Sequence, residues 1–108
     1  MIDSNGAKIV SLDTETQFAP NGIVSRVLWK GANTRVILFG FAEGQEMTEH
    51  TSTRDALVQI LSGECEFSLA GKPHNLKQGD FLFMPANLPH ALRATRQFSM
   101  LLTLTQPA

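Results

Sequence analysis

The chain has 108 residues, with nine Lys or Arg, ten Asp or Glu and three His, so its formal net charge is -1. This length fits one domain, and a chain that is 43% hydrophobic and only 18% charged can bury a core of its own. The near-neutral charge argues against nucleic acid or an anionic membrane surface as a partner, because both require a basic surplus. The single cysteine, Cys65, excludes an intrachain disulfide and a zinc cage built from cysteines.

The first twenty residues are the more polar part of the chain, and we expect them to form an arm or an edge strand ahead of a main domain in residues 21–108. They lack the basic start and apolar run of a signal peptide. No apolar run approaches the roughly 18 residues that a membrane span needs. We therefore expect a cytoplasmic protein without a membrane partner.

Short apolar runs separated by glycines make up most of residues 21–108. Many short strands with frequent turn signals predict an all-β sandwich or barrel, and the chain has no helical connectors of the length that a parallel sheet requires. The runs are Ile23–Trp29, Thr34–Phe41, Ala56–Leu61, Glu66–Leu69, Phe81–Met84 and Phe98–Leu104.

One of these runs has a competing interpretation. Ser52-Thr53-Arg54-Asp55 has the pattern of a capping box and could open a helix over Ala56–Leu61. The run is short and contains two β-branched residues, which favours a strand. Of the turns, Asn21-Gly22 predicts a type I′ hairpin, and Gly71 predicts a chain reversal after Leu69.

Two of the three histidines lie in matching contexts. His50 follows Gly44 with five residues between them, and Gly63 follows His50 with twelve residues between them. His90 follows Gly79 and Pro85 at the end of a similar segment.

These two segments resemble the two sequence motifs of the cupin family. Gly44, His50 and Gly63 match the first motif in register. Gly79, Pro85 and His90 match the second, with Asn87 where the family has a glycine; Asn also tolerates the left-handed region of backbone conformation. The motifs cover residues 44–94, about half of the chain. The resemblance implies a single cupin-type double-stranded β-helix, or jelly-roll, barrel in residues 21–108.

The resemblance also implies a metal site, from which this chain departs. Cupins usually hold a metal with three His and one Glu, but Ser52 occupies the position of the second His and Ala56 that of the Glu. Ala94 replaces the final Asn of the second motif. Since His50 and His90 alone would hold a divalent metal weakly, we expect either no cofactor or a weakly bound Zn, Mn, Fe or Ni.

Other residues are open as a third metal ligand. Regular strand alternation places Thr48, His50 and Ser52 on one face, and Glu46 shares that face if the strand is regular so far back. His74 is the other candidate, although its neighbours favour a solvated turn residue.

Two functions remain open. In the first, the barrel binds a small-molecule ligand, with metal binding weak or absent. In the alternative, the protein is a metal-dependent enzyme of the dioxygenase, isomerase or decarboxylase class that uses His50, His90 and a third ligand such as His74. A purely structural role, with both histidines bonded to backbone carbonyls, is the competing interpretation for His50 and His90. The residues that we expect to line the ligand pocket are His50, His90, Ser52, Ala56, Val58, Met84 and Leu92.

Three further expectations concern the rest of the chain. Small single-barrel cupins are commonly homodimers, and Ile23–Trp29 is an apolar run that could pair across the two-fold axis. Cys65 lies between Glu64 and Glu66, which disfavour a thiolate, so we do not expect a reactive nucleophile. A further group is expected to form the barrel core and a dimer face: Phe39, Phe41, Phe67, Phe81, Phe83, Phe98, Met84 and Met100.

Overall fold

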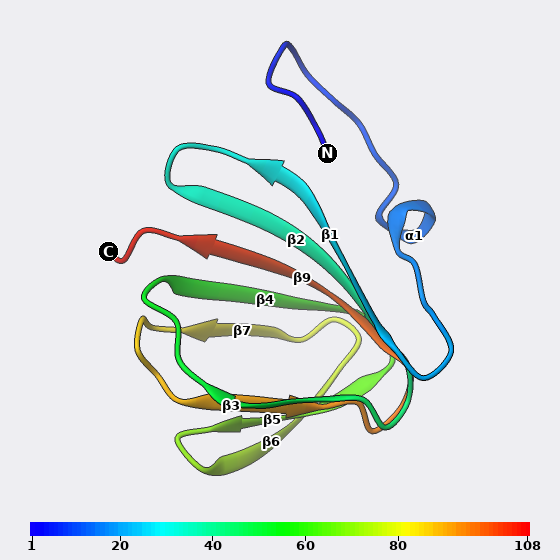
Figure 1. Cartoon of the computed structure of the whole chain (residues 1–108), viewed down its shortest axis with the longest axis vertical. Helices are drawn as coiled ribbons and strands as arrows, with labels where there is room; N and C mark the ends of the chain where they lie inside the picture. Colours follow the sequence, from blue (N-terminus) through cyan, green and yellow to red (C-terminus); the bar gives the residue numbers. More distant parts are fainter.

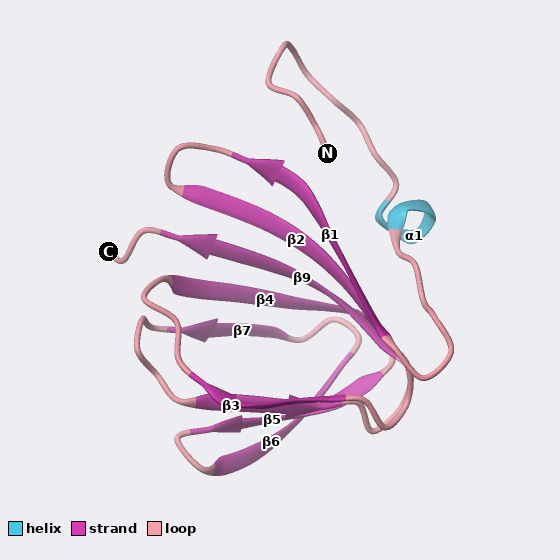
Figure 2. Cartoon of the chain, in the orientation of Figure 1, coloured by secondary structure: helices cyan, strands magenta, loops and turns pink.

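The fold is a sandwich of two antiparallel sheets, which confirms the all-β prediction. The computed structural model describes all 108 residues, and nine strands account for most of them (Figure 2). The helical part is a single short segment, α1 (Leu12–Glu15), and no helix is long and apolar enough to cross a membrane.

The strands are distributed between the sheets in jelly-roll order, and neighbouring strands pair antiparallel (Figure 1). The five-stranded sheet runs in the order β1 (Ile23–Lys30), β2 (Thr34–Phe41), β9 (Phe98–Thr105), β4 (Asp55–Ser62), β7 (Phe81–Met84). The four-stranded sheet runs in the order β3 (Glu46–His50), β8 (His90–Arg93), β5 (Glu64–Leu69), β6 (Lys72–Lys77).

All six apolar runs form strands, including the run for which a helix competed. Ala56–Leu61 lies within β4, where its alternate residues face the core. The hydroxyl oxygen of Ser52 accepts a hydrogen bond from the N–H of Arg54, two residues on, so it supports a turn and caps no helix. The strand β6 lies outside the apolar runs because it is an exposed edge strand with polar residues on both faces.

The two predicted turns differ in outcome. Ala70 and Gly71 have positive φ angles of 50° and 83° and join β5 to β6, which confirms the reversal at Gly71. The prediction of a type I′ hairpin at Asn21-Gly22 is wrong. Asn21 has a positive φ of 54° but Gly22 does not, and the turn precedes β1 without joining two strands. Pro20 explains this difference, since proline followed by a left-handed residue is typical of a type II turn.

The first twenty residues form an arm with one helical turn and no strand. The arm crosses the outer face of β1 and β2: a Cβ on Gly40 would fall on the carbonyl oxygen of Gln17, so only glycine permits this close approach. The Trp29 indole N–H donates to the Ser4 hydroxyl. The expected dimer strand, β1, does lie at the edge of its sheet, and the homodimer itself stays a prediction.

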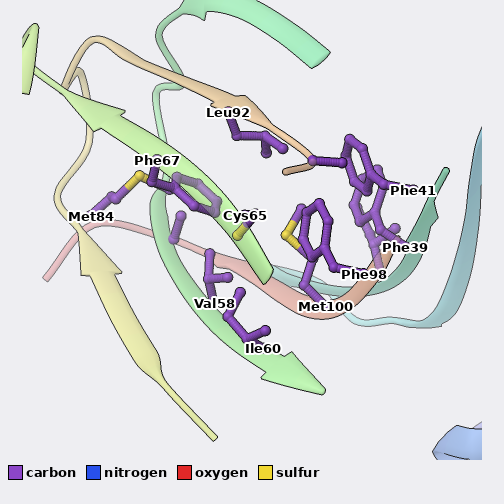
Figure 3. Close-up of a cluster of buried hydrophobic side chains, with 13 residues drawn as sticks. Phe39, Phe41, Val58, Ile60, Cys65, Phe67, Met84, Leu92, Phe98 and Met100 are labelled. Carbon is purple, nitrogen blue, oxygen red and sulfur yellow. The ribbon is translucent and has the colours of Figure 1, made fainter. Parts of the chain in front are cut away.

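The core lies between the two sheets and is most tightly closed at one end. There Phe41 and Phe98 are fully buried with their rings stacked at a centroid distance of 4.6 Å, and Cys65 is buried beside them (Figure 3). Phe81 and Phe83 lie outside this core. They are 58% and 51% exposed, because they alternate along β7 with residues that face inward.

Two glycines with positive φ provide a test of this packing. Gly63 has a φ of 74°, and a Cβ there would fall on the carbonyl oxygen of Gln97, whereas Gly79 has a φ of 93° and open space around it. We expect Gly79→Ala to lower the free energy of unfolding by about 1–2 kcal/mol, through backbone strain alone. Gly63→Ala should lower it by more than about 3 kcal/mol, because backbone must also move. Urea unfolding followed by circular dichroism measures both, and equal losses would contradict the packing at Gly63.

Candidate functional site

A cavity of about 280 Å³ lies between the sheets. Along β9, Phe98 packs into the closed end of the sandwich, while Met100 and the two inward-facing leucines after it line the cavity. Eleven of the fourteen lining residues are hydrophobic. The other three, His50, Ser52 and His90, are uncharged as long as the imidazoles are neutral. The lining residues are Ile37, Phe39, Met47, His50, Ser52, Ala56, Val58, Phe67, Met84, His90, Leu92, Met100, Leu102 and Leu104.

His50 and His90 lie side by side on the four-stranded sheet. They are forty residues apart in sequence but are direct cross-strand partners in the antiparallel pair of β3 and β8. Their ring centroids are 4.2 Å apart, with the ring planes inclined at 61°. His90 is buried, at 9% exposure, whereas His50 is exposed. The pair therefore has one buried and one solvated member.

A β-bulge in β3 decides which of its residues face the cavity. Met47 pairs with Leu92 and His50 pairs with His90, so two residues of β3 stand opposite the single Ala91 of β8. The extra residue shifts the alternation, and both Met47 and His50 face the cavity.

The prediction that Thr48 shares the face of His50 is therefore wrong, and the regularity of the strand on which the prediction for Glu46 depended does not hold. Both residues line a separate depression on the opposite face of this sheet, together with Arg93. Glu46 is exposed there and does not reach the histidine pair.

The hydrogen bonds of the two imidazoles determine which ring nitrogen is free. Nδ1 of His50 lies 2.8 Å from the carbonyl oxygen of Thr48, and Nδ1 of His90 lies 2.8 Å from that of Leu88. A carbonyl oxygen only accepts hydrogen bonds, so each Nδ1 must carry the proton and donate it. In a neutral imidazole this leaves Nε2 as a hydrogen-bond acceptor or metal ligand. The purely structural interpretation, in which both histidines are bonded to backbone carbonyls, therefore accounts for Nδ1 of each ring but not for Nε2.

Hydrogen bonds tie the loop that carries Ser52 to the loop that precedes His90. The N–H of Asn87 donates to the carbonyl of Ser52, at 2.7 Å, which ties the loop before β8 to the loop before β4. Asp55 is buried, and its two carboxylate oxygens accept the N–H groups of Ala86 and Ala108. Asn87 has a φ of 70°, which confirms that it adopts the left-handed conformation expected at the glycine position of the motif.

The structure brings all seven residues expected in the ligand pocket to the wall of this one cavity. That they contact a ligand stays a prediction. The remaining lining residues include Phe39, Phe67 and Met100, which were expected in the barrel core and a dimer face. Period-two alternation along Phe98–Leu104 is a signal that could have identified the residues contributed by β9. Met47 gave no such signal, since the bulge is not visible in the sequence.

His74 is not part of this arrangement. It lies in the middle of β6, not in a turn, with an exposed side chain on the edge of the four-stranded sheet. It does not line the cavity that holds His50 and His90.

The donor set does not fit a resident metal of the usual cupin kind. Catalytic metal sites generally have about three protein ligands, and here two imidazoles face the cavity with Ser52 and Ala56 at the other expected positions. No group of three or more His, Cys, Asp or Glu side chains is placed to hold a metal. Weak binding of a divalent metal stays a prediction.

Cys65 is fully buried, and burial raises the pKa of its thiol to about 12, with the negative charge of Asp80 adding to the effect. This supports the expectation of low reactivity, but for a different reason than the sequence suggested. The neighbouring Glu64 and Glu66 are not the cause of the raised pKa.

Comparison with known proteins matches residues 37–104 to the family model described as a cupin domain. A conserved protein of unknown function from Streptococcus pyogenes, known from a crystal structure, is 34% identical in sequence. The match covers 96% of this chain and 91% of that protein's chain, with a TM-score of 0.86. A cupin superfamily protein from Desulfitobacterium hafniense is 26% identical, covers 94% and 93% of the two chains, and has a TM-score of 0.86. An uncharacterized protein from Aquifex aeolicus is 31% identical over 68 residues, which span 63% of this chain and 56% of the relative.

The assignment of the ring protons is directly testable. At about pH 8, where free imidazole is neutral, long-range ¹H–¹⁵N spectra should show His50 and His90 protonated at Nδ1. His74 is the internal control, because its exposed ring has no carbonyl partner and should keep the Nε2–H form that free imidazole prefers. The Nε2–H form at His90 would contradict the hydrogen bond to Leu88.

The raised pKa of Cys65 predicts slow alkylation. A thiol pKa of about 12 leaves only about one molecule in ten thousand as thiolate at about pH 8. Iodoacetamide should therefore modify the folded protein far more slowly than the urea-unfolded chain, as measured by mass spectrometry. Equal rates in the two states would show that Cys65 is not buried in solution.

Proposed function

Because the chain belongs to the cupin domain family, we propose that its barrel binds a small, largely apolar molecule, which His50 and His90 orient from one side of the cavity. The observation that supports this most strongly is the composition of the cavity wall. A mostly apolar lining with a few convergent polar groups is typical of small-molecule sites. Only His50, Ser52 and His90 are polar among the lining residues.

The volume of the cavity and the flexibility of its methionine side chains also support the binding of a ligand. Its volume, about 280 Å³, is close to the lower end of ordinary ligand pockets. Three of the four methionines, Met47, Met84 and Met100, line it. Methionine side chains are flexible and polarizable, so this wall can adapt to the shape of an apolar guest.

The alternative is a metal-dependent enzyme of the dioxygenase, isomerase or decarboxylase class. In its favour, each imidazole donates Nδ1–H to a backbone carbonyl, an arrangement common among metal-ligating histidines. Against it, neither His74 nor Glu46 reaches the cavity as a third ligand. Stoichiometric Zn, Mn, Fe or Ni in protein purified without a histidine tag, lost in His50→Ala, would favour the enzyme.

The methionines allow a direct test of ligand binding. Protein labelled with ¹³C at the methionine methyl groups should give one signal for each of its four methionines. Titration with naphthalene should shift the signals of Met47, Met84 and Met100, while Met1, which is 78% exposed, serves as the internal control. Cavity signals that respond neither to naphthalene nor to its hydroxyl derivative 2-naphthol, each added up to its solubility limit, would overturn the proposed function.

Substitutions at two alanines check that naphthalene occupies the cavity. Ala56 lines the cavity, so the larger side chain in Ala56→Leu should fill part of it and weaken naphthalene binding by about tenfold or more. Ala91 lies on the opposite face of its sheet, and Ala91→Leu should leave binding unchanged. Equal affinities of the two variants would place the probe elsewhere.

A further inference from the structure

We infer that the ligand is a neutral molecule of the phenol or alcohol class, in which an apolar body of about two rings carries a hydroxyl group that donates a hydrogen bond to Nε2 of His90. This inference rests on the proposed function and names the chemical class that the same cavity would select. Four features of the cavity support it.

The first feature is the absence of charge on the cavity wall. No Lys, Arg, Asp or Glu lines the cavity. The nearby Arg54 lines a different depression, and its guanidinium donates to the carbonyl of Asn33 at 2.9 Å. A carboxylate or phosphate would lose its hydration on entering without gaining a cation, so the wall disfavours anionic ligands.

The second feature is the excess of acceptors over donors. Both Nδ1 protons are committed to backbone carbonyls, so neutral His50 and His90 present Nε2 lone pairs. Ser52 has the only side-chain hydroxyl on the wall; its oxygen accepts the N–H of Arg54 at 3.1 Å and its O–H stays free to donate, so the wall offers two Nε2 acceptors against one donor. A ligand must therefore bring a donor to complement this side of the cavity.

The third feature is the unequal burial of the two rings. Nε2 of the exposed His50 can be hydrogen-bonded by water whether or not a ligand is bound. His90 is only 9% exposed, and a ligand that fills the cavity would cut its Nε2 off from water. A buried acceptor without a partner is costly, so one donor directed at His90 is the minimum requirement.

The fourth feature is the available volume. An apolar cavity of about 150 Å³ is large enough for benzene. A cavity of about 280 Å³ has room for roughly twice as much, a molecule the size of two fused rings. The aromatic rings of Phe39 and Phe67 lie on its wall.

Three ligands of matched shape test the inference at about pH 8, where free imidazole is neutral. They are 2-methylnaphthalene, 2-naphthol and 2-naphthoate, with affinities measured from the methionine methyl signals. We expect 2-naphthol to bind about tenfold more tightly than 2-methylnaphthalene, the upper end of what one hydrogen bond contributes. The carboxylate of 2-naphthoate should bind at least about tenfold more weakly than 2-methylnaphthalene. Equal affinities of 2-naphthol and 2-methylnaphthalene, or tightest binding by 2-naphthoate, would overturn the inference.

Two histidine variants assign the preference to one ring. His90→Phe should abolish the preference for 2-naphthol over 2-methylnaphthalene. His50→Phe should keep most of that preference, because water can hydrogen-bond Nε2 of His50 whether or not a ligand is bound. Loss of the preference in His50→Phe alone would overturn the assignment to His90. If His90→Phe does not fold, the comparison of the three ligands on the unmodified protein still decides the ligand class.

The same titrations separate this inference from the proposed function. If 2-methylnaphthalene shifts the signals of the cavity methionines and 2-naphthol binds no better, only the inferred ligand class is wrong. If none of the three molecules shifts those signals, the proposed binding function is wrong as well.

Discussion

The two sheets of this barrel close tightly at one end only, and the other features of the molecule depend on that. At the closed end the stacked rings of Phe41 and Phe98 fill the space between the sheets. Beyond them Ala56 and Val58 contribute small side chains to the wall of the cavity, which Met47, Met84 and Met100 also line. The burial that raises the pKa of Cys65 and the apolar wall that faces the histidine pair are both consequences of this one packing arrangement.

The two departures from the usual cupin ligand set have a structural effect besides removing metal donors. Alanine at position 56 adds open volume where the resemblance implies a glutamate, and Ser52 replaces an imidazole with a smaller hydroxyl. The loops around these residues are nevertheless tied together by hydrogen bonds of Asp55 and Asn87. The cavity wall is therefore less polar than the usual cupin ligand set would make it, which supports the proposal that a small molecule binds there.

The histidine pair shows how backbone geometry can determine side-chain chemistry. The carbonyls of Thr48 and Leu88 accept from Nδ1 in both rings, so the neutral pair presents two acceptors. Burial then separates their roles, since water can reach His50 but has little access to His90. Hydrogen bonds to the carbonyls two residues earlier in the chain therefore determine which ring nitrogen is free to accept.

The sequence by itself determined the strand class, the reversal at Gly71 and the cupin-type barrel, because alternation, turn chemistry and motif spacing are local properties of the chain. It also placed seven residues correctly on one cavity wall, since the motif positions carry their register with them. Only the tertiary structure decided the rest. The β-bulge that turns Met47 inward and Glu46 outward depends on the pairing of β3 with a strand forty residues away. The unequal burial of His50 and His90 depends on β3 lying at the edge of its sheet and β8 inside it, which no local pattern specifies.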